Sequence, residues 1–225
     1  MLYLFLCAHL VADFVLQPYW LVMRKRHLDG LLIHCGIVLL CMLALPLLDY
    51  ATSALIPAML IITLVHFAAD WWKVHYGHII PGPPIVPFLL DQIIHLTTIV
   101  VVLSAMLTPG SMWGVQASPY GLFALYGAAY VVAAFATPIG AMIWLDPNAA
   151  NAALSGGARL RSVLAGISVV SITVFGGLVA FPATLMGMVV LARHPQSNHP
   201  LDMPAGMLTV LAVGASMGTL LALMG

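Results

Sequence analysis

Histidine and aspartate recur four residues apart inside apolar stretches of this sequence. The pairs are His9 and Asp13, His66 and Asp70, and, in the reverse order, Asp91 and His95. Residues four apart share one face of an α-helix, so each pair presents an imidazole and a carboxylate together. Another histidine, His34, lies in an apolar stretch of its own. Ionisable side chains are costly in hydrocarbon, so we expect these residues to face the interior of a helix bundle and to have partners there.

This set of side chains predicts a metal site. Imidazole nitrogens and carboxylate oxygens together are ligands for Zn²⁺, Mn²⁺ or Fe²⁺, and a water bound to such a divalent transition metal is a nucleophile at neutral pH. One metal, or two bridged by an aspartate, would fit. The expected ligands are His9, Asp13, His66, Asp70 and His95. His34 and Asp91 are the expected catalytic residues, as general base or as groups that orient the ligands.

The composition is that of an integral membrane protein. The 225 residues are 63% hydrophobic and only 6% charged, and the mean hydropathy is +1.09, whereas soluble domains carry about 25% charged residues. The net charge is zero, and no basic tract suggests binding to nucleic acid. We therefore expect most of the chain to lie in a lipid bilayer.

The apolar stretches predict an all-α fold, a polytopic transmembrane helix bundle of about seven spans, because about 20 apolar residues cross a bilayer as a helix. The expected spans are residues 1–23, 30–49, 52–72, 86–108, 119–145, 161–192 and 204–224. The sixth is long enough to tilt, and Pro182 could kink it. We expect residues 1–108 to form a four-helix core that carries the His/Asp site, and residues 109–225 to form a three-helix supporting region.

The first four spans form an imperfect repeat of two hairpins. In each hairpin the first helix carries the HxxxD pattern and the second carries a histidine, His34 or His95. Two hairpins of the same orientation suggest a pseudo-two-fold axis along the membrane normal, with the site on that axis. The repeat is broken before these histidines, since Asp91 precedes His95 by four residues whereas Gly30 precedes His34.

The basic residues predict the orientation of the chain. Six of them fall on one side of the predicted spans: Arg24, Lys25, Arg26, Lys73, Arg159 and Arg161. The positive-inside rule puts this side in the cytoplasm, which leaves the N-terminus outside. We expect a multi-pass protein of the cell inner (plasma) membrane in which each aspartate of the site is nearer the cytoplasm than its histidine. Arg193 then falls on the opposite side, where His194, His199 and Asp202 would be ordinary loop residues.

These features favour a metal-dependent hydrolase or related enzyme that acts on a lipid-like substrate from the cytoplasmic side. Two alternatives use the same residues: a metal-ion or proton-coupled transporter with a transit site, and a non-catalytic subunit of a membrane complex with a structural polar cluster. A transporter needs polar groups that continue to the outer face, and the last three spans offer only serine and threonine. The expected partners are the lipid bilayer, the lipid-like substrate, and a second copy of the chain or another membrane-complex subunit.

Several stretches resemble one known family. They are "AHLVADFVLQPYW" (8–20), "LLIH" (31–34), "LVHFAADWWK" (64–73) and "FLLDQIIHL" (88–96), which resemble the signature blocks of the domain-of-unknown-function 3307 family of bacterial membrane proteins. The C-terminal stretches resemble that family more loosely, with Leu160 before Arg161 where the family tends to have Glu before Arg. The resemblance implies a bacterial polytopic membrane protein. It implies no particular activity, because the family is largely uncharacterised.

Overall fold

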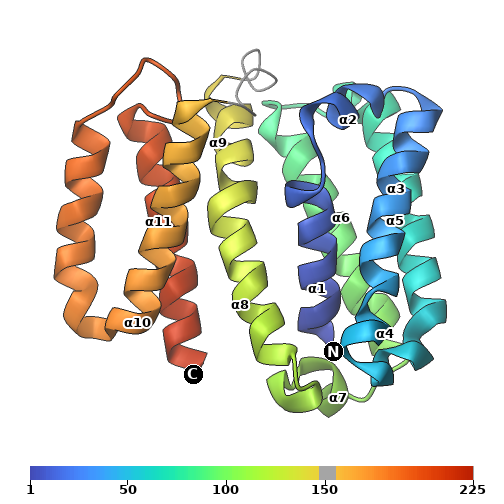
Figure 1. Cartoon of the computed structure of the whole chain (residues 1–225). Helices are drawn as coiled ribbons and strands as arrows, with labels where there is room; N and C mark the ends of the chain where they lie inside the picture. The colour runs from blue at the N-terminus through green and yellow to red at the C-terminus, as the bar shows by residue number, and fades with distance from the viewer. Residues whose placement is uncertain (147–155, 225) are drawn as a thin grey trace. The chain divides into compact units, whose positions relative to one another are not determined.

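The computed structural model describes residues 1–146 and 156–224, and this part of the chain is built from helices with no strand (Figure 1). Six described helices are long and apolar enough to cross a membrane: Leu28–Leu48, Tyr50–Ile79, Ile85–Ser104, Gly121–Leu145, Gly157–Gly177 and Pro204–Met224. Two further apolar helices, Leu2–Val15 and Pro182–Arg193, are shorter. The prediction of an all-α helical membrane bundle is confirmed.

The first helix is shorter than the predicted span of residues 1–23. It consists of α1 (Leu2–Leu10) and a π-helical turn, η1 (Val11–Val15). Pro18 then adopts an extended conformation, with ψ 159°, before the short helix α2 (Tyr19–Arg24) begins. Proline lacks the backbone N–H that a continuing helix would need, and it disfavours helical geometry in the residue before it. The expectation of one continuous helix over residues 1–23 is therefore wrong.

The chain divides into two compact units, Met1–Ala128 and Ala129–Gly225. The first unit, which is described throughout, contains all of the predicted core over residues 1–108 and is built around four long helices. These are α1 with η1, α3 (Leu28–Leu43), α5 (Ile56–Tyr76) and α6 (Ile85–Ser104). Figure 1 shows α1 and α5 running in one direction and α3 and α6 in the other.

The packing order of these helices matches the predicted two-hairpin repeat. Helix α1 contacts α3 and α6, and α5 contacts the same two helices. The two helices that carry HxxxD therefore lie diagonally across the bundle, and so do the two that carry the additional histidines. Side chains that point inward from all four helices can meet near the central axis.

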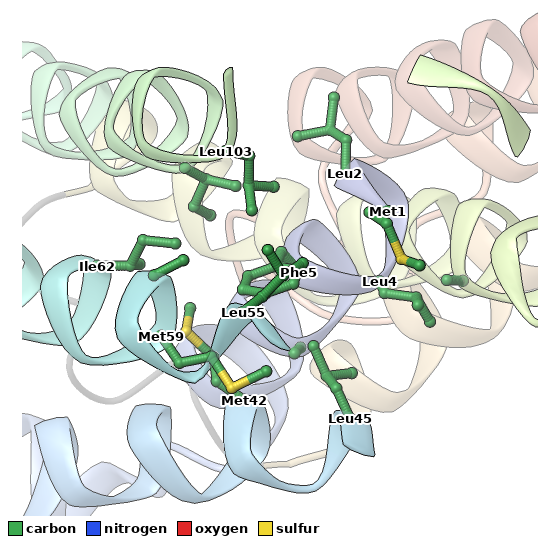
Figure 2. Close-up of a cluster of buried hydrophobic side chains, with 14 of the residues drawn as sticks. Met1, Leu2, Leu4, Phe5, Met42, Leu45, Leu55, Met59, Ile62 and Leu103 are labelled. Atoms are coloured by element: carbon green, nitrogen blue, oxygen red, sulfur yellow. The ribbon is translucent and has the colours of Figure 1, made fainter. Parts of the chain in front are cut away.

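Short elements connect the four long helices. They are α4 (Leu45–Leu48), η2 (Tyr50–Leu55), η3 (Gly77–Ile79), α7 (Pro109–Trp113) and η4 (Val115–Ala117), after which α8 (Gly121–Val131) begins. At the end of the bundle formed by α4 and α7, apolar side chains fill the space between the helices (Figure 2). Phe5, Met42, Met59 and Leu103 are completely buried there. This end of the bundle is closed by apolar packing, which is a main source of stability between membrane helices.

The second unit contains η5 (Val132–Ala136), α9 (Thr137–Leu145), α10 (Gly157–Arg193) and α11 (Pro204–Met224). Helix α10 is interrupted at Gly177, where φ is 55° and ψ is −155°, and the chain reverses direction there (Figure 1). Ala165 of the first arm packs in one buried cluster with Met188 and Ala192 of the second. The predicted sixth span, residues 161–192, is therefore a hairpin. It breaks at Gly177 and not at Pro182, because glycine alone readily adopts this backbone conformation.

The hairpin changes the position of the segment that follows it. Arg161, near the start of α10, forms an ion pair with Asp202 and donates hydrogen bonds to the carbonyl oxygens of Leu191 and His194. Asp202 is buried and also accepts a hydrogen bond from the Ser197 hydroxyl. The expectation that His194, His199 and Asp202 are ordinary loop residues on the opposite side from Arg161 is wrong, because the second arm of α10 returns the chain to the same end.

Candidate metal centre

The seven ionisable residues singled out in the sequence meet inside the first unit. His9 comes from α1, Asp13 from η1, His34 from α3, His66 and Asp70 from α5, and Asp91 and His95 from α6. Every one of these side chains is buried, with at most 7% of its surface exposed. Their spacing along each helix turns them to the interior, as expected for ionisable groups in a membrane bundle.

Four of these residues form the most complete ligand set. His9, Asp13, His66 and His95 each offer one nitrogen or oxygen atom, and these four atoms lie within 4.8 Å of one another. The ring centroids of His66 and His95 are 4.0 Å apart, and that of His9 lies 5.4 Å from His66 and 5.2 Å from His95. Three imidazoles and one carboxylate around a common centre suit Zn²⁺, Mn²⁺ or Fe²⁺.

Two smaller groups share members with this set. His34, His66 and Asp70 form one, and Asp70, Asp91 and His95 form the other, each with ligand atoms within 4.8 Å. The Nε2 atoms of His34 and His66 are only 3.0 Å apart. His34 Nε2 also lies 3.4 Å from Asp13 Oδ1 and 3.3 Å from Asp70 Oδ2. His34 is thus held between two carboxylates beside the four-residue set.

Many polar atoms of the cluster have no hydrogen-bond partner in the protein. They are both ring nitrogens of His9 and of His95, Nδ1 of His34 and of His66, and Oδ1 of Asp13 and of Asp91. Buried polar groups are nearly always paired, and leaving one unpaired costs about 1–3 kcal/mol. A bound cation can satisfy buried nitrogen and oxygen atoms of this kind, one from each ligand, so these residues fit a metal ion.

Two lysines that the sequence marks only as cytoplasmic charges reach the carboxylates of the cluster. Lys25 Nζ donates to Asp70 Oδ2 at 2.8 Å, and Lys73 Nζ donates to Asp91 Oδ2 at 2.7 Å. Among residues 1–128, Asp13 is the one carboxylate of the cluster that has no lysine or arginine partner. The negative charge of Asp13 is therefore the least compensated of the three, and a bound cation would stabilise it most.

The spacing in the sequence indicates that Lys73 lies near the cluster, but nothing in the sequence indicates this for Lys25. Lys73 follows Asp70 by three residues on α5, so the two share a helix face with His66. Lys25 follows α2, a separate short helix, and no periodic pattern relates it to Asp70. Only the tertiary structure brings them together.

The segment from η1 to Lys25 is folded back onto the centre by specific contacts. The π-helical turn at Val11–Val15 contains Asp13, and such turns are frequent at functional sites. With its amide oriented to satisfy both partners, Gln17 donates to the backbone carbonyl of Asp13 at 2.7 Å and accepts from Lys25 Nζ at 2.8 Å. Gln17 thus links the backbone at Asp13 to Lys25, which in turn binds the Asp70 carboxylate.

Gly30 explains why the two hairpins differ. A Cβ atom at this position would lie 2.2 Å from the backbone carbonyl oxygen of Arg24, which is far inside van der Waals contact. A side chain equivalent to Asp91 is therefore excluded at Gly30. The backbone beside it instead presents Lys25 to the centre.

A family model described as "Protein of unknown function (DUF3307)" matches residues 1–123, which is more than half of the chain. The protein belongs to this family. The DUF3307 match includes all seven residues of the centre and both lysines, and it ends before the α10 hairpin. No curated protein and no solved structure matches the chain. The resemblance seen in the sequence to the domain-of-unknown-function 3307 family is thereby confirmed.

Proposed function

We propose that this protein is an intramembrane metal-dependent hydrolase that acts on a lipid-like substrate. In this proposal His9, Asp13, His66 and His95 bind one divalent transition metal, Zn²⁺, Mn²⁺ or Fe²⁺. The observation that carries the proposal is the concentration of buried, unpartnered nitrogen and oxygen atoms on these residues. A purely structural polar cluster would pair its donors with its acceptors. The unpartnered atoms therefore argue against a non-catalytic subunit with such a cluster.

The charges of the cluster support a cation. Three aspartates contribute −3, the two lysines contribute +2, and neutral histidines contribute nothing, which leaves −1. An uncompensated negative charge in a buried site is unfavourable, and a cation is its natural partner. A divalent metal at this position would supply a bound water that is acidic enough to be a nucleophile at neutral pH.

In this proposal His34 is the general base and Asp91 is a group beside the ligands. His34 Nε2 faces the four-residue set and is flanked by Asp13 and Asp70, so it can take a proton while the carboxylates stabilise the imidazolium. Asp91 Oδ1 lies 3.7 Å from His95 Nδ1, and Lys73 holds the other oxygen of the same carboxylate. At this distance Asp91 acts on His95 through its charge and not through a hydrogen bond.

The distribution of apolar and charged side chains along the bundle favours an enzyme over a transporter. The half of the bundle near α4 and α7 is filled by buried side chains such as Phe5, Met59 and Leu103. A transporter would need a polar path through this half. The other end of the bundle carries Lys25 and Lys73, which the positive-inside rule assigns to the cytoplasm. Access from that end suits a lipid-like substrate of the cytoplasmic leaflet.

The test is elemental analysis of the purified protein, together with an assay of lipid hydrolysis. Wild type should carry a stoichiometric transition metal, and His66→Ala should lose it. His75→Ala is the matched control, since His75 lies on the same helix but is exposed and bonds only the Trp71 carbonyl oxygen. His34→Gln should keep the metal and lose turnover. Wild-type protein without stoichiometric metal, or His66→Ala with an unchanged metal content, contradicts the proposal.

A further inference from the structure

We propose that Lys25 and Lys73 form a binding site for the phosphate group of the substrate, at the exposed end of the metal centre. This inference rests on the proposed function and names the chemical class of the lipid: one that carries a phosphate on its headgroup. Four observations carry it, namely the unused donors of the two lysines, their position, the charge of the centre and the exposed side chains of α2.

The two ammonium groups have hydrogen-bond donors to spare. An ammonium carries three N–H groups. Lys73 Nζ uses one on Asp91, and Lys25 Nζ uses two, on Asp70 and Gln17. Three N–H groups therefore remain for a ligand. Phosphate oxygens are strong acceptors for such charge-assisted hydrogen bonds.

Both ammonium groups border the same centre from its outer side. The carboxylates of Asp70 and Asp91 belong to one group of ligand atoms within 4.8 Å, and each binds one lysine. The side chains of Lys25 and Lys73 are 13% and 32% exposed, whereas those of the two aspartates are 4% and 3% exposed. The lysines thus lie between the buried carboxylates and the surface, where a headgroup would arrive.

The charge of the metal-loaded centre calls for an anion. With neutral histidines the cluster carries −1, from three aspartates and two lysines, so a divalent ion with a neutral bound water changes this to +1. An anionic ligand then completes the charge balance. A phosphate monoester carries between one and two negative charges at neutral pH. Its several oxygens can accept hydrogen bonds from more than one donor, which suits a site bordered by two ammonium groups.

The surroundings of Lys25 favour a lipid as the source of the phosphate. Helix α2, which immediately precedes Lys25, exposes Tyr19 and Trp20, the latter with 56% of its surface exposed. Tyrosine and tryptophan are enriched at the depth of lipid headgroups. Lys25 therefore follows a segment suited to that depth, and its ammonium group reaches inward from there to Asp70.

The experiment is isothermal titration calorimetry on metal-loaded, full-length protein in a neutral detergent. The probes are a non-hydrolysable phosphonate analogue of dioctanoyl phosphatidate, dioctanoylglycerol as the neutral lipid, and inorganic phosphate. We expect the phosphonate lipid to bind most tightly. Lys25→Gln and Lys73→Gln should each weaken its binding roughly tenfold or more. Arg26→Gln is the control, because Arg26 is an exposed cation in the same linker and its loss should change binding by less than about twofold.

Metal content is measured on the same samples, so that loss of the phosphate site is distinguished from loss of the metal centre. Lys25→Arg and Lys73→Arg keep the charge and should keep most of the binding, which guards against variants that merely fail to fold. Inorganic phosphate that binds as tightly as the lipid would support the phosphate site and assign it to a soluble phosphate compound. Equal affinity for the neutral lipid, or unchanged binding in the glutamine variants at normal metal content, would overturn the inference. Absence of metal from wild type refutes the proposed function instead.

Discussion

At the scale of single residues, the three carboxylates of the centre are not equivalent. Asp70 and Asp91 each bind a lysine, whereas Asp13 is surrounded by His9, His34 and His66. A carboxylate that is already paired with an ammonium gains less from a metal than one that is buried without a charged partner. Asp13 should therefore contribute most to metal affinity among the aspartates.

We expect Asp13→Asn to lower metal affinity at least about tenfold. An amide is a weaker metal ligand than a carboxylate, and the substitution also removes the negative charge of Asp13. Asp49→Asn provides the control. Asp49 is a buried aspartate of the same unit that accepts a hydrogen bond from Ala51 N and takes no part in the cluster. Metal competition with a chelator of known affinity measures the difference. Equal metal affinity in the two variants would show that Asp13 is not a ligand.

At the scale of elements, close packing between the backbone at Gly30 and the backbone at Arg24 determines where Lys25 lies relative to the centre. The segment from Gln17 to Leu28 must turn back within a few residues so that Lys25 can reach Asp70. The π-helical turn, Pro18 and Gly30 together make this turn possible. The geometry of the centre therefore depends on residues that do not touch it.

Gly30→Ala should lower the free energy of unfolding by about 1–3 kcal/mol, because the new methyl group would overlap the carbonyl oxygen of Arg24 and force the backbone apart. Gly36→Ala, on the same helix, meets nothing within 4 Å and should be neutral or stabilising by up to about 1 kcal/mol. Thermal unfolding in detergent measures both variants. If Gly30→Ala is as stable as Gly36→Ala, the close contact between Gly30 and the Arg24 carbonyl oxygen is not needed for the stability of the fold.

At the scale of the whole molecule, the arrangement of the α10 hairpin decides which loops share a side of the membrane. Arg161 at the start of α10 contacts Leu191 near the end of the second arm, and His194 and Asp202 beyond it. The second arm, Pro182–Arg193, has 12 residues and spans about 18 Å at 1.5 Å per residue. These contacts, and not the length of the arm, place the end of the second arm beside the start of α10.

Cysteines introduced as Gly157→Cys and Ser197→Cys, in a chain whose native cysteines are replaced, should therefore react with a membrane-impermeant maleimide from the same side. A single span over residues 161–192 would put them on opposite sides, and that labelling pattern would refute the hairpin. Labelling of intact cells and of inverted vesicles distinguishes the two outcomes. Ser111→Cys, between α6 and α8, provides an independent marker for the orientation of the first unit.

The sequence by itself determined the membrane environment, the helical class and the residues that converge. These features follow from local chemistry: apolar stretches must be helical in a bilayer, and a spacing of four residues puts histidine and aspartate on one helix face. His9, Asp13, His66 and the other members of the cluster could therefore be named without a structure.

Only the tertiary structure decided which of these residues already have partners and where the helices end. The pairing of Lys25 with Asp70 joins residues 45 positions apart, and no helical period relates them. The break at Gly177 depends on a backbone conformation that glycine permits but does not require. Contacts between distant segments and optional backbone states depend on the packing of the whole chain. Spacing alone could not show that Asp13, unlike Asp70 and Asp91, lies among histidines without a lysine partner.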